Sequence, residues 1–376
     1  MRRARPEILG AILGGRVELM LAGDFAETRG GAAATDAFVL FHVAPWLNVQ
    51  VGQFDVPFTF ENRTSDRYIE FLERSFVVRN LGTAPKEPGV MVFGLAPDRS
   101  LFYSIGLFNG DGINQRNLDD QFDLVGRAFV RPLVRQHTLD RVQLGGSFST
   151  GRRRFLDTAY LGGATTDDGW LTTGSGWSFF RTTYAGSDGM GTPIGVVPSG
   201  QTNRLGAEVS VPVGRFAFRS EYIYMAQDVD ENLLGTGAVL RRAGELEAHG
   251  VYGLLSYWPI GNPRLLPDAG VHSDQRAETP SITDAHHLQL VTRVDYVHAR
   301  YAPGVDTGPH ALGGSQVGGA YRVVDLAVGA NLWWTRHVRF SFNYILHHVD
   351  GGLAARTPSP DQALLHELGA RVALSL

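Results

Sequence analysis

The chain has 376 residues and a mass of 41.0 kDa, and its 34 basic and 38 acidic residues give a formal charge of −4 and a pI near 6.3. This balance argues against a nucleic-acid-binding protein, because it leaves no basic surface for a phosphate backbone. The absence of cysteine excludes disulfide frameworks, thiolate metal sites and cysteine nucleophiles. No stretch approaches the roughly 18 apolar residues that a membrane-spanning helix needs.

The first fifteen residues give no sign of a strand or of an export signal. Their only apolar stretch, 8–13, is too short and too interrupted by glycine for the apolar region of a secretory signal. We therefore expect residues 1–15 to be a poorly ordered N-terminal remnant, with the natural start upstream. Residues 16–376 are expected to form a single domain, because no shift in composition marks a boundary.

From residue 16 onward, apolar and polar side chains alternate with a period of two, which places them on opposite faces of a β-strand. In the segment 216–224, Phe216, Phe218 and Tyr222 alternate with Arg219 and Glu221. The other strong segments are 16–25, 122–131, 204–211, 288–296, 338–347 and 364–376, and weaker ones lie near 37–43, 46–56, 90–97, 101–108, 141–149, 177–184, 246–258 and 321–334. Together they predict about fifteen strands.

The connections between these strands alternate in length. Short turns at 213–215 and 335–337 join pairs of strands, whereas longer stretches rich in Gly, Asp, Thr and Pro occupy 151–176, 185–200, 228–244, 261–285 and 302–320. Transmembrane β-barrels have this combination of short turns, long loops and strands of about ten residues with one apolar face. We predict an all-β, antiparallel transmembrane barrel of about sixteen strands. A soluble propeller or sandwich is the alternative, although no blade-length repeat is detectable.

Three motifs resemble the phosphate-selective porin O and P family of Gram-negative outer membranes. They are Val-Gly-Gln-Phe-Asp-Val-Pro-Phe at 51–58, Gly-Leu-Phe-Asn-Gly-Asp-Gly-Ile-Asn at 106–114 and Val-Gly-Ala-Asn-Leu-Trp-Trp at 328–334. The resemblance implies a sixteen-stranded trimeric barrel whose pore is narrowed by an inward-folded loop and lined by arginines that pass anions. It further implies an outer-membrane location with lipid and lipopolysaccharide as neighbours and small anionic solutes as cargo.

The segment 59–87 is the predicted constriction loop, because it is too long for a simple connection between strands. Within it, 65–74 has the spacing of a short helix, with Thr64 or Ser65 as the cap. Rings of Arg or Lys favour the passage of anions through a pore. The candidate anion contacts in the loop are Arg63, Arg67, Arg74 and Lys86. The alternative is that Arg67 and Arg74 pair with Glu70, Glu73 or acids of the barrel wall and only hold the loop in place.

A second set of candidate anion contacts lies on the strands. The arginines in the polar phase with this role are Arg127, Arg131, Arg219, Arg293 and Arg339. Together they could guide anions by focusing the electrostatic potential. The alternative is that each is an ion-paired wall residue, since acids such as Glu208, Glu221 and Asp295 share the same phase.

No catalytic or metal-binding arrangement is recognisable in the sequence. The histidine pairs at 286–287 and 347–348 cannot each chelate one ion, because adjacent strand residues point to opposite faces. No nucleophile occurs in a recognisable setting such as a GxSxG turn. We therefore expect a passive channel for small hydrophilic solutes, chiefly anions such as phosphate, that needs no cofactor. The alternatives are a non-selective porin, a soluble all-β binding protein and a barrel enzyme.

Overall fold

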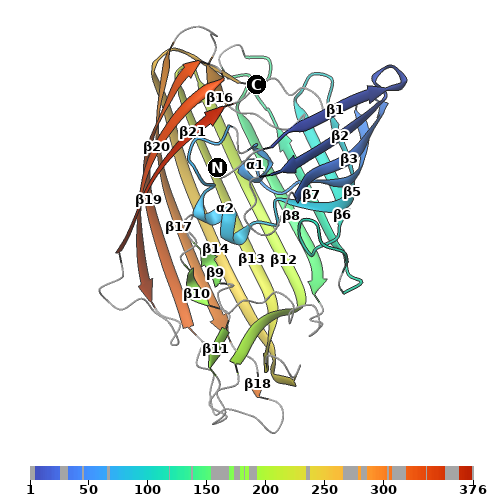
Figure 1. Ribbon diagram of the computed structural model, residues 1–376, viewed down its shortest axis with the longest axis vertical. Coiled ribbons are helices and arrows are strands. Elements are labelled where there is room, and N and C mark those ends of the chain that lie inside the picture. The colour runs from blue at the N-terminus through green and yellow to red at the C-terminus, as the bar shows by residue number, and fades with distance from the viewer. Residues whose placement is uncertain are drawn as a thin grey trace.

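The computed structural model describes residues 5–25, 33–44, 46–65, 68–117, 119–136, 139–153, 169–172, 178–181, 183–185, 193–233, 238–265, 278–280, 286–302, 305–306, 319–335, 337–351 and 364–374. These residues confirm the predicted all-β class, since one antiparallel sheet contains most of them (Figure 1). Within this described part, no helix is long and apolar enough to cross a membrane.

The large sheet contains seventeen strands, each antiparallel to its neighbours. Fifteen of them are long: β1 (Glu7–Ile12), β2 (Val17–Asp24), β3 (Ala33–Ala44), β4 (Leu47–Asp55), β5 (Lys86–Leu95), β6 (Leu101–Phe108), β7 (Asp123–Val130), β8 (Gln143–Arg153), β12 (Pro193–Val213), β13 (Phe216–Leu233), β14 (Ala238–Ile260), β17 (His287–Ala302), β19 (Gly319–Thr335), β20 (Val338–Gly351) and β21 (Leu364–Leu374). They pair in this order from β1 to β21.

The remaining elements are short. Strand β11 (Thr183–Ala185) pairs with β12 and β18 (Val305–Asp306) with β14, while β9 (Gly169–Thr172) pairs with β10 (Ser178–Arg181) and β15 (Pro263–Leu265) with β16 (Glu278–Pro280) in two small sheets. The helical elements are η1 (Leu13–Gly15), α1 (Phe60–Arg63) and α2 (Phe76–Leu81).

The two edges of the large sheet are β1 and β21, and no pairing within the described residues joins them. Because antiparallel strands alternate in direction, the first and the fifteenth strand of the series run the same way. Figure 1 shows these edge strands on either side of an open seam. The sixteenth long strand of the predicted barrel is not among the described strands.

Three sequence predictions need correction. The sheet begins before residue 16, since Glu7–Ile12 forms β1 and pairs with β2 through the turn at η1. The described residues of the expected loops 185–200 and 228–244 are mostly strand, because β12, β13 and β14 extend into these ranges. Strand pairing there tolerates a polar, glycine-containing composition, which the sequence pattern interpreted as a loop. The short turns are confirmed, with β12 ending at Val213 and β13 beginning at Phe216.

The sheet is apolar on the face open to the surroundings and charged on the face that the rest of the chain covers. On β17, Leu290 and Val294 are exposed on the outer face, whereas Arg293 and Asp295 are buried on the inner face. On β20, Phe342 and Tyr344 are exposed and Arg339 is buried. A soluble protein would bury the first set and expose the second, so this arrangement indicates a lipid environment around the sheet.

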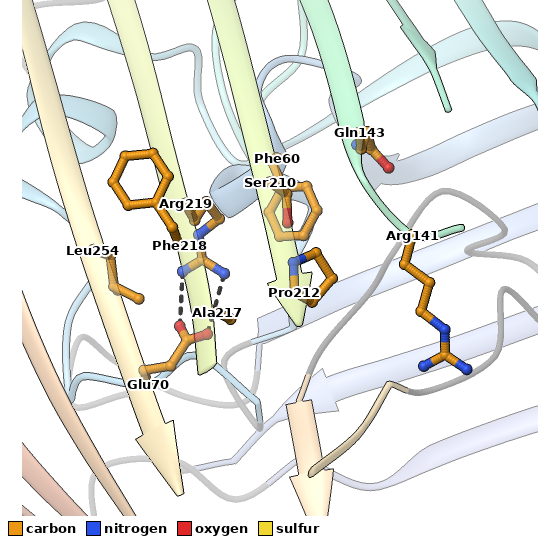
Figure 2. Close-up of a pocket in the computed structure, with 10 residues that line it drawn as sticks. All are labelled: Phe60, Glu70, Arg141, Gln143, Ser210, Pro212, Ala217, Phe218, Arg219 and Leu254. Carbon is orange, nitrogen blue, oxygen red and sulfur yellow. Dashed lines mark hydrogen bonds and ion pairs between the residues drawn. The ribbon is translucent and has the colours of Figure 1, made fainter. Parts of the chain in front are cut away.

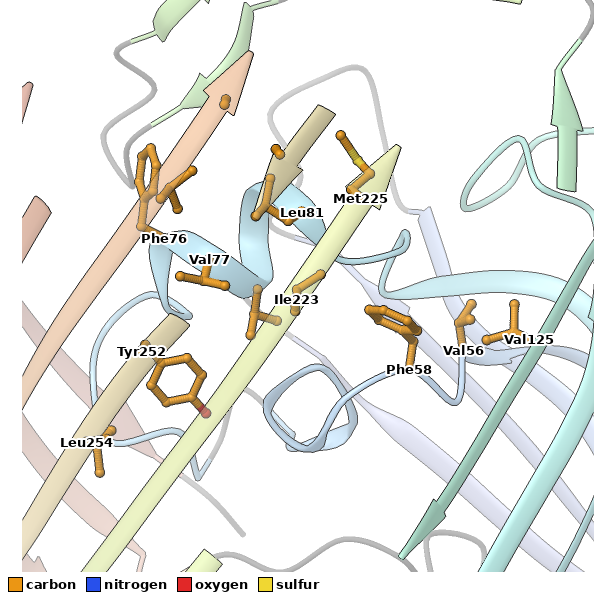
Figure 3. Close-up of a cluster of buried hydrophobic side chains, with 14 of the residues drawn as sticks. Val56, Phe58, Phe76, Val77, Leu81, Val125, Ile223, Met225, Tyr252 and Leu254 are labelled. Carbon is orange, nitrogen blue, oxygen red and sulfur yellow. The ribbon is translucent and has the colours of Figure 1, made fainter. Parts of the chain in front are cut away.

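The apolar core lies between the inner face and the segment that joins β4 to β5. We call residues 56–85, apart from the undescribed pair 66–67, the inner segment. Figure 3 shows Phe76, Val77 and Leu81 of α2 against Ile223 and Tyr252 of the wall. This contact is close because Gly250 has no side chain: a Cβ there would lie 2.9 Å from the Tyr296 carbonyl oxygen and 3.1 Å from a Val77 methyl.

The outer face provides a direct test of the environment. Replacing Val294, which is 49% exposed near the middle of β17, by Arg should lower the free energy of unfolding in lipid vesicles by about 2–4 kcal/mol, because a charge would enter the hydrocarbon. Val294→Leu, which keeps the site apolar, should change it little. Equal stability of the two variants in vesicles would contradict a lipid-facing outer surface.

Candidate functional site

The inner segment leaves the sheet after β4. Hydrogen bonds to carboxylates and to a hydroxyl hold the N-termini of its two short helices in place. The backbone N–H groups of Phe60 and Glu61, at the start of α1, donate to the Glu221 carboxylate of β13 at 2.6 and 2.9 Å. Ser75 caps α2, since its Oγ accepts the Val78 N–H at 3.0 Å. The Ser75 N–H in turn donates to Glu61 Oε2 at 2.8 Å, so Glu61 links the two helices.

The middle of the inner segment is not the helix that the spacing of 65–74 predicts. Only one turn forms, with the Tyr68 and Ile69 N–H groups donating to the Ser65 carbonyl oxygen. Beyond it, wall side chains bind the backbone directly: Arg339 donates to Ile69 O at 3.2 Å, Asn331 to Glu70 O at 2.8 Å and Arg293 to Glu73 O at 3.3 Å, and Asn343 Oδ1 accepts the Leu72 N–H at 2.7 Å. These contacts satisfy backbone groups that a helix would have used internally, which explains the error.

The strongest attachment of the inner segment is the ion pair between Glu70 and Arg219 of β13. The guanidinium donates twice to the carboxylate, at 3.1 and 2.7 Å, and both side chains are buried. Arg219 also donates to the Tyr252 hydroxyl at 3.1 Å, and its guanidinium carbon lies 5.1 Å from the centre of the Phe60 ring. Bidentate geometry makes this the strong form of a charged hydrogen bond.

A second wall arginine, Arg293 of β17, completes the attachment. It donates to Asp295 at 2.8 Å and lies over the ring of Phe71 at 4.6 Å. Glu61 lies 3.8 Å from both Arg219 and Arg293, so this carboxylate sits between two wall cations. The inner segment therefore brings carboxylates to a wall that supplies guanidinium groups.

Each predicted loop cation that the structure describes bonds to another group of the protein. Arg63, buried in α1, donates to the Asp55 carbonyl oxygen at 2.6 Å. Arg74 donates to the carbonyl oxygens of Glu61 and Thr64 at 3.2 and 2.9 Å. Lys86 lies 2.6 Å from Asp36 and 2.7 Å from Asp55. Arg67 lies outside the described residues.

The predicted wall arginines separate into two groups. Arg219, Arg293 and Arg339 contact the inner segment, as described above. Arg127 instead pairs bidentately with Glu208 of β12 at 2.9 and 2.7 Å. Arg131, which follows β7, donates to the Arg99 carbonyl oxygen at 3.3 Å and lies over Phe129 at 4.7 Å. The eight predicted site residues that the structure describes therefore do not converge on one site.

The sequence reasoning missed Glu61 and the side-chain amides that hold the segment, and it named Glu70 and Glu221 only as possible ion-pair partners of arginines. Glu61, Glu70 and Glu221 hold the segment, and the side-chain amides of Asn331 and Asn343 bind its backbone. The amides were recognisable as polar residues in the inward phase of β19 and β20. Nothing in the spacing of the loop acids distinguishes them from surface residues.

A small cavity lies beside the Arg219–Glu70 pair (Figure 2). Its volume is about 20 Å³, and it is lined by Phe60, Glu70, Arg141 and Arg219 among others. A space of this size holds about one water molecule.

The part of the chain that the structure describes contains no cluster of side chains arranged to bind a metal ion. No group of three or more His, Asp or Glu side chains there could hold an ion. His347 is buried and bonds to Asp325 at 2.7 Å, whereas His348 is exposed, so the predicted opposite orientation of this pair is confirmed.

The comparisons with known proteins agree with this architecture. The family model of phosphate-selective porin O and P matches residues 1–373. The fold is similar to that of OmpTdeltaL8, a loop-deletion mutant of OmpT, an outer membrane protein of Vibrio cholerae, with 10% sequence identity, a TM-score of 0.53 and coverage of 94% of this chain and 86% of that chain.

A second solved structure, outer-membrane expressed OmpT of Vibrio cholerae, has 11% identity and a TM-score of 0.49, with coverage of 96% of this chain and 83% of that chain. No curated protein matches the sequence significantly. At this identity the likeness to OmpTdeltaL8 shows the fold alone, and the family rests on the family model.

A double-mutant cycle can measure the coupling free energy between Arg219 and Glu70 of the inner segment. Arg219→Gln, Glu70→Gln and the double variant should give a coupling of about 1–3 kcal/mol in the free energy of unfolding, because the pair is buried and bidentate. The control is the pair Arg322–Asp350, whose side chains are 55% and 62% exposed and whose coupling should stay below about 1 kcal/mol. Equal coupling in the two cycles would rule out a special role for Glu70.

Proposed function

The chain belongs to the phosphate-selective porin O and P family, and we propose that it conducts small hydrophilic solutes across the outer membrane by passive diffusion, with phosphate-like anions preferred. The family establishes an outer-membrane porin, and the fold is similar to that of an outer-membrane protein. The observation that carries the channel is the placement of charged side chains on the inner face and apolar side chains on the outer face. Such a wall encloses a wet interior within lipid. On this proposal the protein is a channel and not an enzyme.

We propose that the inner segment sets the narrowest part of this channel. It starts and ends on the neighbouring strands β4 and β5, and its contacts lie on β13, β17, β19 and β20. A segment held in this way occupies the interior of the curved sheet and narrows the path of a solute. The selectivity would then depend on the charges that the segment presents to the solute.

The preference for anions rests on the family and on the abundance of arginine, since Lys86 is the single lysine. The geometry limits the strength of this preference for anions. Arg127, Arg219 and Arg293 each bond to a carboxylate, and Lys86 lies between two. Neutralised cations attract a passing anion weakly, which favours a non-selective porin as the second candidate. A homotrimer and contacts with lipopolysaccharide stay predictions of the resemblance.

We also propose that a sixteenth strand closes the barrel between β21 and β1. An open edge would leave unpaired N–H and C=O groups in hydrocarbon, which is too costly to persist. Direct pairing of β21 with β1 would be parallel, because these two strands run in the same direction. One strand inserted between them would be antiparallel to both and would give the even number typical of bacterial barrels.

Single-channel recording tests the selectivity. Arg79 is exposed on α2, and its charge can be reversed without removing the buried ion pairs. Because two unit charges 4 Å apart in water interact by about 1 kcal/mol, Arg79→Glu should lower the anion-to-cation permeability ratio several-fold, as read from the reversal potential in a salt gradient. Phosphate should block the wild-type current more strongly than that of the variant.

Arg152→Glu is the matched control, since Arg152 is exposed in the outer phase of β8. This variant should leave the anion-to-cation permeability ratio unchanged. A wild-type channel without anion preference or phosphate block would support the non-selective porin instead. Folded protein that forms no channels would refute both candidates.

Disulfide trapping tests the seam, and the natural chain contributes no cysteine. Pairs of cysteines placed along β1 and β21 should fail to cross-link, because strands separated by one intervening strand lie about 10 Å apart and a disulfide needs Cα atoms within about 7 Å. Pairs placed across β20 and β21, such as Asn343 with Gly369, are in register and should cross-link readily. Efficient cross-linking of β1 to β21 would mean that the barrel closes without another strand.

A further inference from the structure

Arg339 of β20 is a buried guanidinium that the protein satisfies only in part. Its side chain is among the largest that are fully buried, and the residue is 2% exposed. One nitrogen, Nη1, donates to the Ile69 carbonyl oxygen of the inner segment at 3.2 Å. Nε and Nη2 are buried and have no hydrogen-bond partner in the structure. Unmet donors on a buried charge are costly, so something should accept from them.

A neighbouring side chain has the same deficit. Trp333 of β19 is paired with Arg339 in the sheet, and the guanidinium carbon lies 4.8 Å from the centre of its ring. The indole Nε1 is also buried without a hydrogen-bond partner. Arg339 and Trp333 therefore place three buried donor atoms in one small region. Neither side chain can accept a hydrogen bond at these atoms.

The charges around this region are predominantly positive. Arg371 of β21, in register with Ser341 two residues beyond Arg339, repels the Arg339 guanidinium. The acid that attracts Arg339 is Glu70, but both of its carboxylate oxygens already accept from Arg219. Tyr68 of the inner segment is the other titratable group that acts on Arg339. Among the residues that the structure describes, the site thus has donors and positive charge but no unoccupied side-chain acceptor.

We propose that a small monovalent inorganic anion, such as chloride, binds between the inner segment and the wall at Arg339 and Trp333. An anion accepts from all of the unmet donors and reduces the repulsion between Arg339 and Arg371, whereas a water molecule supplies no charge. A phosphate would bury more acceptor atoms than the three donors can satisfy. The bound anion would hold the stretch around Ile69 against β20, so it serves as part of the structure and not as cargo.

This inference goes beyond the proposed function and does not depend on it, because a site under the inner segment can be filled whether or not solutes pass. The first readout is the thermal unfolding midpoint of the detergent-solubilised protein. Chloride or bromide should replace gluconate at constant ionic strength, which separates specific binding from screening. The midpoint should rise with halide concentration, as expected for a ligand that binds only the folded state.

Two variants and a control locate the effect. Trp333→Phe keeps the ring and removes one donor, so it should weaken the apparent halide affinity by roughly tenfold. Arg339→Gln should abolish the halide dependence. Arg141→Gln removes an arginine of the turn before β8 whose side chain is 46% exposed, and it should respond to halide like the wild type.

Anomalous diffraction from crystals grown in bromide gives the direct observation. A bromide peak within hydrogen-bond distance of Arg339 Nε or Nη2 and of Trp333 Nε1 would establish the site. A water molecule at that position, or a midpoint that is the same in halide and gluconate, would overturn the proposal. If Arg339→Gln does not fold, the comparison of Trp333→Phe with the wild type still decides the outcome.

Discussion

The constraint on which the rest of the structure depends is that charges in the middle of the sheet, where lipid surrounds it, must face inward, whereas outward charges such as Arg322 and Asp350 lie near strand ends. Lipid on the outer side accepts only apolar side chains, so the strands place Arg, Asp, Glu, Asn and His on the inner face. Charges crowded onto one concave surface cannot all remain hydrated once a segment packs over them. The wall and the inner segment solve this together, since the segment brings Glu61 and Glu70 to the wall cations Arg219 and Arg293.

These buried pairs orient the inner segment more than they stabilise the fold. Removing two charges from water costs several kcal/mol per ion, and good geometry repays that cost only approximately. The cost of a mispaired charge is much larger, so alternative placements of the segment are strongly disfavoured. Side-chain amides add directional contacts, because Asn331 and Asn343 bind the backbone of Glu70 and Leu72. The result is a segment of little regular structure in one well-defined position.

The sequence was sufficient for the strands and insufficient for the segment. Alternation with a period of two identified the inward phase of Arg219, Arg293 and Arg339, since each strand repeats the signal over many residues. The helix predicted over 65–74 was wrong, because its spacing was real but wall side chains took the backbone groups at Ile69, Glu70 and Glu73. Glu208 and Asp295 share the phase of the arginines that they pair with, but the partner of Arg219 was hidden, since Glu70 lies 149 positions away. The period of two describes one strand at a time, whereas pairing across the interior depends on the curvature of the whole sheet.

The path of the inner segment has a mechanical consequence. It is rooted in adjacent strands, β4 and β5, and fastened to β13, β17, β19 and β20 further around the sheet. A segment attached in this way connects distant strands of the curved sheet across its interior. Lateral pressure from the bilayer tends to flatten such a wall into an ellipse. The inner segment opposes any change in the distance between the strands that it connects. The bore of the channel would therefore stay constant as the surrounding membrane changes thickness or tension.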